Sequence, residues 1–255
     1  MKAYKYKKTL IFSIVSFLTI ALFVHAFFDT FGETQLEFDI HQDQKLILFS
    51  DYSEPPQFAI WLENPATGQL KTVFVTRSSA QGEWVGKTEC PGSLPLWFEV
   101  FKKEYQVNSL PGRDKLLPIA ITGATPQDEH FKVCAEVPFD SEWICWMEVN
   151  LAGDFNEHFD SSGDNPNATL DDSGQASIVY KARFKSKKGA VIKPEIVGYV
   201  DITKDFDNMI QPLEGISTAK DIFKDITIRV IRPKPALFKW SYKYRKPVNN
   251  LEDVK

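Results

Sequence analysis

The sequence contains few of the residues from which catalytic and metal sites are usually built. Among its 255 residues are four histidines and three cysteines, and neither a Cys-x-x-Cys nor a His-x-His ligand pair occurs. A Gly-x-Ser-x-Gly elbow and a glycine-rich strand-to-helix turn are also missing. These absences argue against a zinc-ribbon protein, a serine hydrolase and a Rossmann-type nucleotide enzyme, and we expect no catalytic activity.

Positive charge is scarce beyond the N-terminus. The formal net charge is −4, but the first 26 residues carry four lysines and no acidic residue. The rest of the chain therefore has 26 basic and 34 acidic residues, a net charge of −8. A nucleic-acid-binding protein needs a basic face, so this balance argues against that class.

A long uncharged run follows a basic leader at the N-terminus. The four lysines lie in residues 1–8, and residues 9–28 contain no Asp, Glu, Lys or Arg. Twenty helical residues span about 30 Å, the thickness of a bilayer core, and the lysines predict a cytoplasmic N-terminus. The run is therefore a single-pass anchor in the cytoplasmic membrane or a signal peptide cleaved after Ala26. Both alternatives place residues 29–255 in the periplasm or another extracytoplasmic space.

Short segments rich in β-branched and aromatic residues dominate the chain after residue 34. Gly, Pro, Asn and Asp separate these segments, as they do between strands of antiparallel sheets. Nine strands are predicted, at residues 35–40, 45–51, 57–63, 70–78, 130–137, 142–150, 176–185, 195–202 and 225–231. The pattern predicts an all-β, Ig-like antiparallel β-sandwich that forms one domain over residues 29–255.

Two segments favour a helix over a strand. Apolar residues between Leu94 and Tyr105 recur at intervals of three and four, which predicts a short amphipathic helix over one end of the sandwich. A second short helix is predicted to begin at Ser217, which can cap a helix N-terminus.

Two of the three cysteines flank a predicted turn. If the loop between their strands is Phe139–Asp140, Cys134 lies opposite Cys145 in an antiparallel pair. An exported protein could then form a disulfide between them. The alternative is two small buried apolar residues, since a loop one residue longer or shorter turns the side chains to opposite faces. Cys90 is left over.

Several segments in order resemble the extracytoplasmic proteins of the DUF2271 family, a domain of unknown function. They are residues 58–76, 82–97, 120–126, 147–159 and 173–184. The resemblance covers about residues 45–185 and implies a periplasmic Ig-like β-sandwich. Members of that family tend to accompany membrane flavin and PepSY-type redox proteins, which implies an accessory role in a redox assembly. The family has no established catalytic residues to carry over.

The tetrapeptide Thr122-Gly123-Ala124-Thr125 resembles the site at which some exported redox proteins carry covalent flavin mononucleotide (FMN). Thr125 is therefore a candidate attachment point. The transferase usually needs an aspartate three residues before the tetrapeptide, where this chain has Ile119. The alternative is a tight turn that leads into the next strand.

An acidic loop at residues 153–174 offers the oxygen ligands that calcium prefers. EF-hand spacing counted from Asp154 fails, because position 5 is His158. A calcium site of another geometry would use Asp154, Asn156 and Asp160 as ligands. The alternative is a solvated loop in which Asp and Asn form Asx turns.

Taken together, these patterns predict a non-catalytic, membrane-tethered extracytoplasmic binding or scaffold protein. Residues 9–28 would hold it beside a membrane-protein partner, and no cofactor is expected. Two alternatives stay open: a covalent FMN carrier through Thr125, and a calcium-stabilised adhesion-type module.

Overall fold

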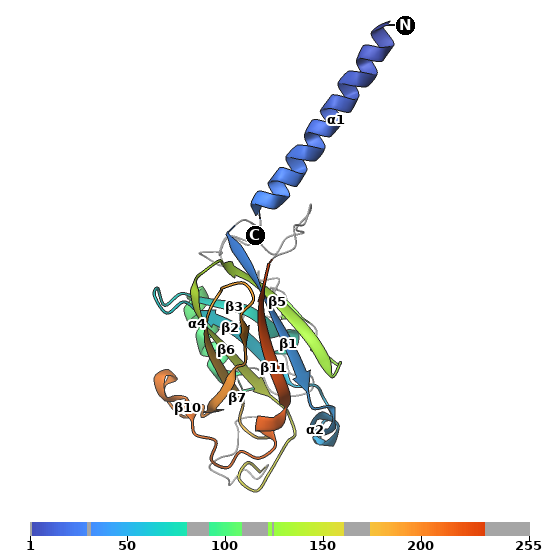
Figure 1. Cartoon of the computed structure of the whole chain (residues 1–255). Helices are drawn as coiled ribbons and strands as arrows, with labels where there is room; N and C mark the ends of the chain where they lie inside the picture. Colours follow the sequence, from blue (N-terminus) through green and yellow to red (C-terminus); the bar gives the residue numbers. More distant parts are fainter. Residues whose placement is uncertain are drawn as a thin grey trace.

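Two β-sheets make up most of the folded chain (Figure 1). The computed structural model describes residues 2–29, 32–80, 92–108, 122–123, 125–160 and 174–232. The four-stranded sheet has the order β5 (His130–Pro138), β1 (Glu33–Gln42), β11 (Phe223–Ile231) and β8 (Val191–Ile192). The seven-stranded sheet has the order β10 (Ile210–Gln211), β9 (Glu195–Val200), β7 (Ile178–Lys185), β6 (Glu142–Asn150), β2 (Gln57–Glu63), β3 (Leu70–Thr76) and β4 (Thr122–Gly123). The predicted all-β sandwich is confirmed.

Alternating side chains explain how the sheets face each other. Along β1 every second residue is buried, and Leu36, Phe38 and Ile40 are fully enclosed. They share one core with inward residues of the other sheet, such as Phe58 and Met147. All described strand pairs are antiparallel except the short β3–β4 pair.

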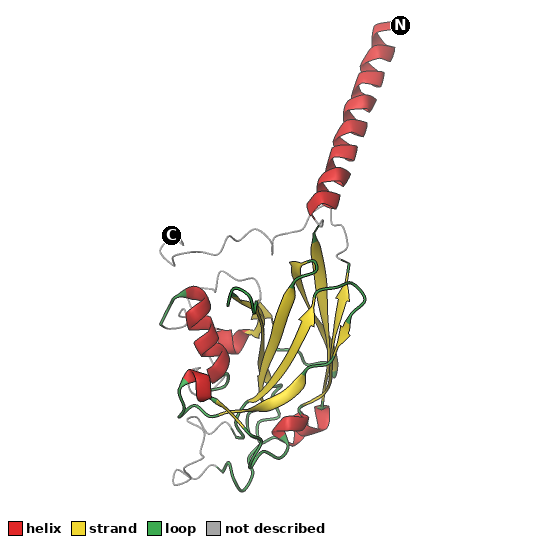
Figure 2. Cartoon of the chain, turned by 60° about the vertical axis from the view of Figure 1, so that its left-hand side comes forward, coloured by secondary structure: helices red, strands yellow, loops and turns green. Residues whose placement is uncertain are grey.

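A second core lies on the other side of the seven-stranded sheet. Helix α4 (Pro95–Tyr105) packs there, and Trp97 and Phe101 contact a cluster that includes Ala59 and Trp61 (Figure 2). The predicted helix is therefore confirmed, but it covers a face of the sheet and not one end of the sandwich. The short helix α3 (Arg77–Ala80) precedes it in the chain, and its Ala80 belongs to the same cluster.

The strand predicted at residues 45–51 is wrong. Helix α2 (Gln44–Phe49) occupies this segment, and the Asp43 carboxylate accepts hydrogen bonds from the backbone N–H groups of Lys45 and Leu46. An N-terminal cap of this kind favours a helix, and the short apolar run of the segment fits a helix or a strand equally well. The helix predicted at Ser217 is a single 3₁₀ turn, Ala219–Asp221, preceded by Thr218; a second 3₁₀ turn spans Phe206–Asn208.

The predicted disulfide is also wrong. Strands β5 and β6 follow each other in the chain but belong to different sheets, so they do not form a hairpin. Cys134 pairs in register with Glu37 of β1, and Cys145 with Leu62 of β2. Both are free thiols, the first exposed and the second buried, and burial raises the pKa of the Cys145 thiol. Cys90 lies outside the described residues.

Helix α1 (Lys2–Asp29) leaves the sandwich as a single rod (Figures 1 and 2). It ends close to the start of β1, so it is attached at the end of the sandwich where β1 begins. Its side chains are described over residues 11–24, where ten large apolar side chains are exposed. No helix in the described part of the chain is both long enough and apolar enough to cross a membrane.

Candidate functional site

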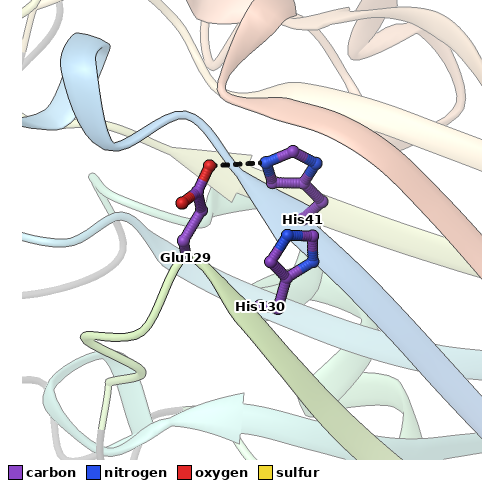
Figure 3. Close-up of side chains that lie close together, drawn as sticks. All are labelled: His41, Glu129 and His130. Carbon is purple, nitrogen blue, oxygen red and sulfur yellow. Dashed lines mark hydrogen bonds and ion pairs between the residues drawn. The ribbon is translucent and has the colours of Figure 1, made fainter.

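Two histidines meet at the end of the four-stranded sheet that lies away from α1. His41 is near the end of β1, and His130 is the first residue of β5 (Figure 3). The two are direct partners in the antiparallel register. Gln42 and Glu129, the residues one step further along, are joined by a hydrogen bond from Gln42 N to Glu129 O at 2.9 Å. Because hydrogen-bonded and non-hydrogen-bonded pairs alternate along an antiparallel ladder, His41 and His130 form a non-hydrogen-bonded pair. Side chains in such a pair lie especially close.

The imidazole rings stack across the two strands. Their centroids are 4.0 Å apart and their planes differ by 29°. The His41 side chain is about one quarter exposed, at 26%, and His130 is exposed. Solvent and small ions can therefore reach both rings.

Glu129 completes the cluster through a hydrogen bond between its Oε1 and His41 Nε2 at 2.9 Å (Figure 3). Gln42 fixes the segment before β5, because its Nε2 donates to the carbonyl oxygens of Pro126 at 3.1 Å and Asp128 at 2.7 Å. The β1–β11 register shifts between His41 and Gln42. The alternation of buried and outward side chains along β1 continues to its last residue, so Gln42 is buried while His41 faces outward.

Carboxylates surround the two rings. The hydrogen bond from His41 holds the pKa of Glu129 below its usual value. Asp225 is the β11 partner of His41, and hydrogen bonding by Lys193 lowers its pKa. The pKa of Asp39, near His130, is lowered chiefly by its hydrogen bond from Arg229. Three ionised carboxylates therefore surround the histidine pair.

The cluster has the donor set of a metal site. His41, Glu129 and His130 each offer one ligand atom, and the three atoms lie within 4.8 Å of one another. Among the residues that the structure describes, this is the group of three His, Cys, Asp or Glu side chains found close enough together to hold an ion. Two imidazoles with one carboxylate suit a divalent d-block cation.

The sequence alone does not reveal this cluster, because its three residues come from segments far apart in the chain. Both strands were predicted, but 88 residues separate His41 from Glu129, and no sequence pattern gives the register across that distance. A usable signal was present: His41 directly follows one predicted strand and His130 begins another.

Thr125 lies beside the seven-stranded sheet, next to Gln57 at the start of β2. Its half-buried Oγ1 accepts a hydrogen bond from Gln57 Nε2 at 3.3 Å. Thr122 and Gly123 form β4, which pairs parallel to β3, so the start of the tetrapeptide is a strand and not a free turn. Ala124 lies outside the described residues. Flavin attachment at Thr125 stays a prediction.

The calcium candidates have partners within the protein. Asp154 is buried, both of its carboxylate oxygens accept hydrogen bonds from Gln175, and burial raises its pKa to about 8. Asn156 Oδ1 accepts from the N–H groups of His158 and Phe159, which makes an Asx turn. Asp160 is half-buried. Residues 161–173 lie outside the described residues, and calcium binding by this loop stays a prediction.

Strands β2 and β6 are neighbours, and each carries a tryptophan followed two residues later by a glutamate. Trp61 is the register partner of Trp146, and the rings stack with centroids 6.3 Å apart. Glu63 accepts a hydrogen bond from Trp146 Nε1 at 2.9 Å. Glu148 is instead buried at the N-terminus of α4, where Trp97 N donates to its Oε2 at 2.7 Å.

Fold and cluster together define an all-β sandwich protein whose four-stranded sheet carries a histidine–carboxylate site. No protein-family model, curated protein or solved structure matches the chain. The resemblance to DUF2271 proteins therefore stays a prediction from the sequence.

Proposed function

We propose that this protein is a membrane-tethered extracytoplasmic binding module without catalytic activity, built on an Ig-like β-sandwich. One observation carries the proposal: an apolar helix projects from the sandwich and leads directly into β1 (Figure 1). Ten large apolar side chains are exposed over residues 11–24, and a helix with so predominantly apolar a surface is typical of a membrane segment or of a large protein core.

The order of charges supports the orientation. Four lysines precede the apolar run, and Asp29 and Glu33 follow it. Lysines stay on the cytoplasmic side of a membrane segment, which leaves the sandwich outside. The alternative within this proposal is that the helix is a signal peptide removed after Ala26.

The tether would orient the sandwich. Strand β1 has ten residues and begins close to α1, so its far end lies about 30 Å from the helix at roughly 3.3 Å per residue. The histidine cluster lies at that far end. A module held in this way presents the cluster away from the bilayer, while the membrane-side end is placed to meet a membrane protein.

A partner within a membrane redox assembly of flavin or PepSY type is the further part of this proposal. It is supported only by the sequence resemblance. Co-purification of the full chain with a flavin-containing membrane protein from its native membranes would test it.

Membrane fractionation tests the tether. In a bacterial host the full chain should sediment with membranes, resist carbonate extraction, and be cut by protease added to spheroplasts. The double variant Leu18→Lys/Ile20→Lys, which places two charges in the apolar run, should abolish membrane retention. A cleaved N-terminus beginning at Phe27 would favour the signal peptide over the anchor.

The matched control is Leu48→Lys. Leu48 is an exposed apolar residue of α2, and its side chain is 66% exposed, so the change adds a lysine without touching α1. The control should fractionate like the wild type. Recovery of intact wild-type protein from the soluble cytoplasmic fraction would contradict the proposal.

A further inference from the structure

We propose that His41, Glu129 and His130 form a binding site for one divalent first-row transition-metal ion of the Zn²⁺ or Cu²⁺ class. This inference does not depend on the membrane tether, because every ligand belongs to the sandwich or to the segment that enters it. It assigns a ligand to the end of the four-stranded sheet farthest from α1.

The ligand atoms are nearly in place. A tetrahedral zinc ion with ligand bonds of about 2.0–2.1 Å holds its ligand atoms roughly 3.3–3.4 Å apart. The three atoms here lie within 4.8 Å of one another, and His41 Nε2 and Glu129 Oε1 are 2.9 Å apart. Small rotations of exposed side chains would bring them to an ion, with no change in the strands.

The backbone explains why the site is pre-organised. The non-hydrogen-bonded register of His41 and His130 holds the two rings together, and they face each other at 4.0 Å. Two hydrogen bonds from the Gln42 side chain hold in place the segment that carries Glu129. A ligand pair on two adjacent strands loses little conformational freedom when it binds an ion.

The donor set selects the class of ion. Calcium and magnesium prefer shells of six or more oxygen ligands, whereas two of the three donors here are imidazole nitrogens. Imidazole suits zinc, copper and nickel, and copper binds such sites most tightly. Asp39 and Asp225 add negative charge beside the rings, although Arg229 and Lys193 pair with them.

Both positively and negatively charged side chains lie near the proposed site. Lys132 of β5 points to Glu37 at 2.9 Å and Asp39 at 3.7 Å, and Lys224 bonds Asp43 at 3.0 Å. Each of these lysines is therefore paired with a carboxylate. Three protein ligands leave at least one coordination position for water or for a group from a partner.

Metal titration of the full chain tests the site. Protein purified in detergent through a tag without histidine should bind one Zn²⁺ or Cu²⁺ per chain in calorimetry. The Cu²⁺ form should show nitrogen hyperfine splitting from two imidazoles in electron paramagnetic resonance. A hundredfold excess of Ca²⁺ or Mg²⁺ should not displace the ion.

Ligand variants give the decisive comparison. His41→Ala and His130→Ala should each weaken binding by more than the roughly 10–100-fold typical of losing an outer-shell partner. Glu129→Gln should weaken it less and leave the two-nitrogen signal. Thermal melts of each variant show whether the fold is intact, which is expected because Glu129 and His130 are exposed.

Two matched controls should bind like the wild type. Glu142→Gln changes another exposed carboxylate at the start of a strand, where it pairs with Arg183 at 2.9 Å. His158→Gln removes a histidine outside the cluster. Binding that survives His41→Ala/His130→Ala, affinity weaker than about 1 mM, or equal binding of Ca²⁺ would each overturn the proposal.

Discussion

The outer faces of the two sheets differ in composition and in what lies against them. On the four-stranded sheet, the outward residues of β1 include Glu37, Asp39 and His41, which are half-exposed. On the seven-stranded sheet, the outward Ala59 and Trp61 are buried beneath α4. The outer face of the four-stranded sheet is therefore solvated and charged, whereas the outer face of the seven-stranded sheet forms one side of a second hydrophobic core.

This difference is visible in the strands themselves. The sequence of β1, ETQLEFDIHQ, alternates polar and apolar residues, and its burial alternates with it. The sequence of β2, QFAIWLE, is buried at six consecutive positions because both of its faces are covered. A ligand site needs solvent-accessible side chains that can contact the ligand. The four-stranded sheet, whose outer face is not covered by α4, supplies them.

Truncating the buried tryptophan through which α4 packs on the sheet should have the largest effect on stability. Trp97 is fully buried, and its Nε1 donates to Thr72 Oγ1 at 3.2 Å. Trp97→Ala should lower the free energy of unfolding by about 3–5 kcal/mol, because it leaves a cavity between α4 and the sheet. Urea denaturation followed by circular dichroism measures the loss.

Phe98 provides the matched control on the same helix. It is only half-buried, and Lys102 Nζ lies 5.1 Å from its ring centroid. Phe98→Ala should cost roughly 1 kcal/mol. Equal losses for the two variants would mean that α4 does not form a core with the sheet.

A buried carboxylate between α4 and the seven-stranded sheet makes the stability of the fold depend on pH. Glu148 is fully buried, and burial raises the pKa of its carboxyl from 4.5 to about 7. Between these values the unfolded chain releases the proton while the folded protein keeps it. The contribution to stability is therefore complete below about pH 4.5 and is lost as the pH rises to about 7. One pKa unit is worth about 1.4 kcal/mol, so the loss is on the order of 3 kcal/mol.

Glu148→Gln should remove that dependence. The amide oxygen can still accept from Trp97 N, and Ser177 Oγ, which donates to the carboxyl group in the wild type, can instead accept from the amide nitrogen. The free energy of unfolding of the wild type minus that of the variant should therefore fall as the pH rises from 4.5 to 7, because only the wild type loses stability over this range. The variant at Glu142, which is exposed, supplies the control; an unchanged difference over this range would refute the assigned pKa.

Much of the fold could be predicted from the sequence. The strands at 57–63 and 142–150 have the expected bounds, because β-branched and aromatic runs between turn residues are a strong local signal. The helix at Pro95–Tyr105 follows from its apolar spacing. Both signals lie within a dozen residues of the chain.

The pairing of strands could not be predicted in the same way. The prediction of a disulfide is wrong because β5 and β6, although consecutive in the chain, belong to different sheets. The histidine cluster was missed for the related reason that β1 and β5 pair across a long stretch of chain. Sheet membership and register depend on tertiary packing, which local sequence patterns do not record.

The smallest effect should come from breaking an ion pair on the charged face. Arg229 bridges Asp39 at 2.6 Å and Glu37 at 3.4 Å, and its side chain is 42% exposed. Arg229→Ala should leave the unfolding midpoint close to wild type at 0.15 M salt and lower it only at low ionic strength, because water and salt screen such pairs. Arg183→Ala, which breaks the more exposed pair with Glu142, should behave alike. A loss comparable to that of Trp97→Ala would show that the face bearing His41 is packed against another surface and is not open to a ligand.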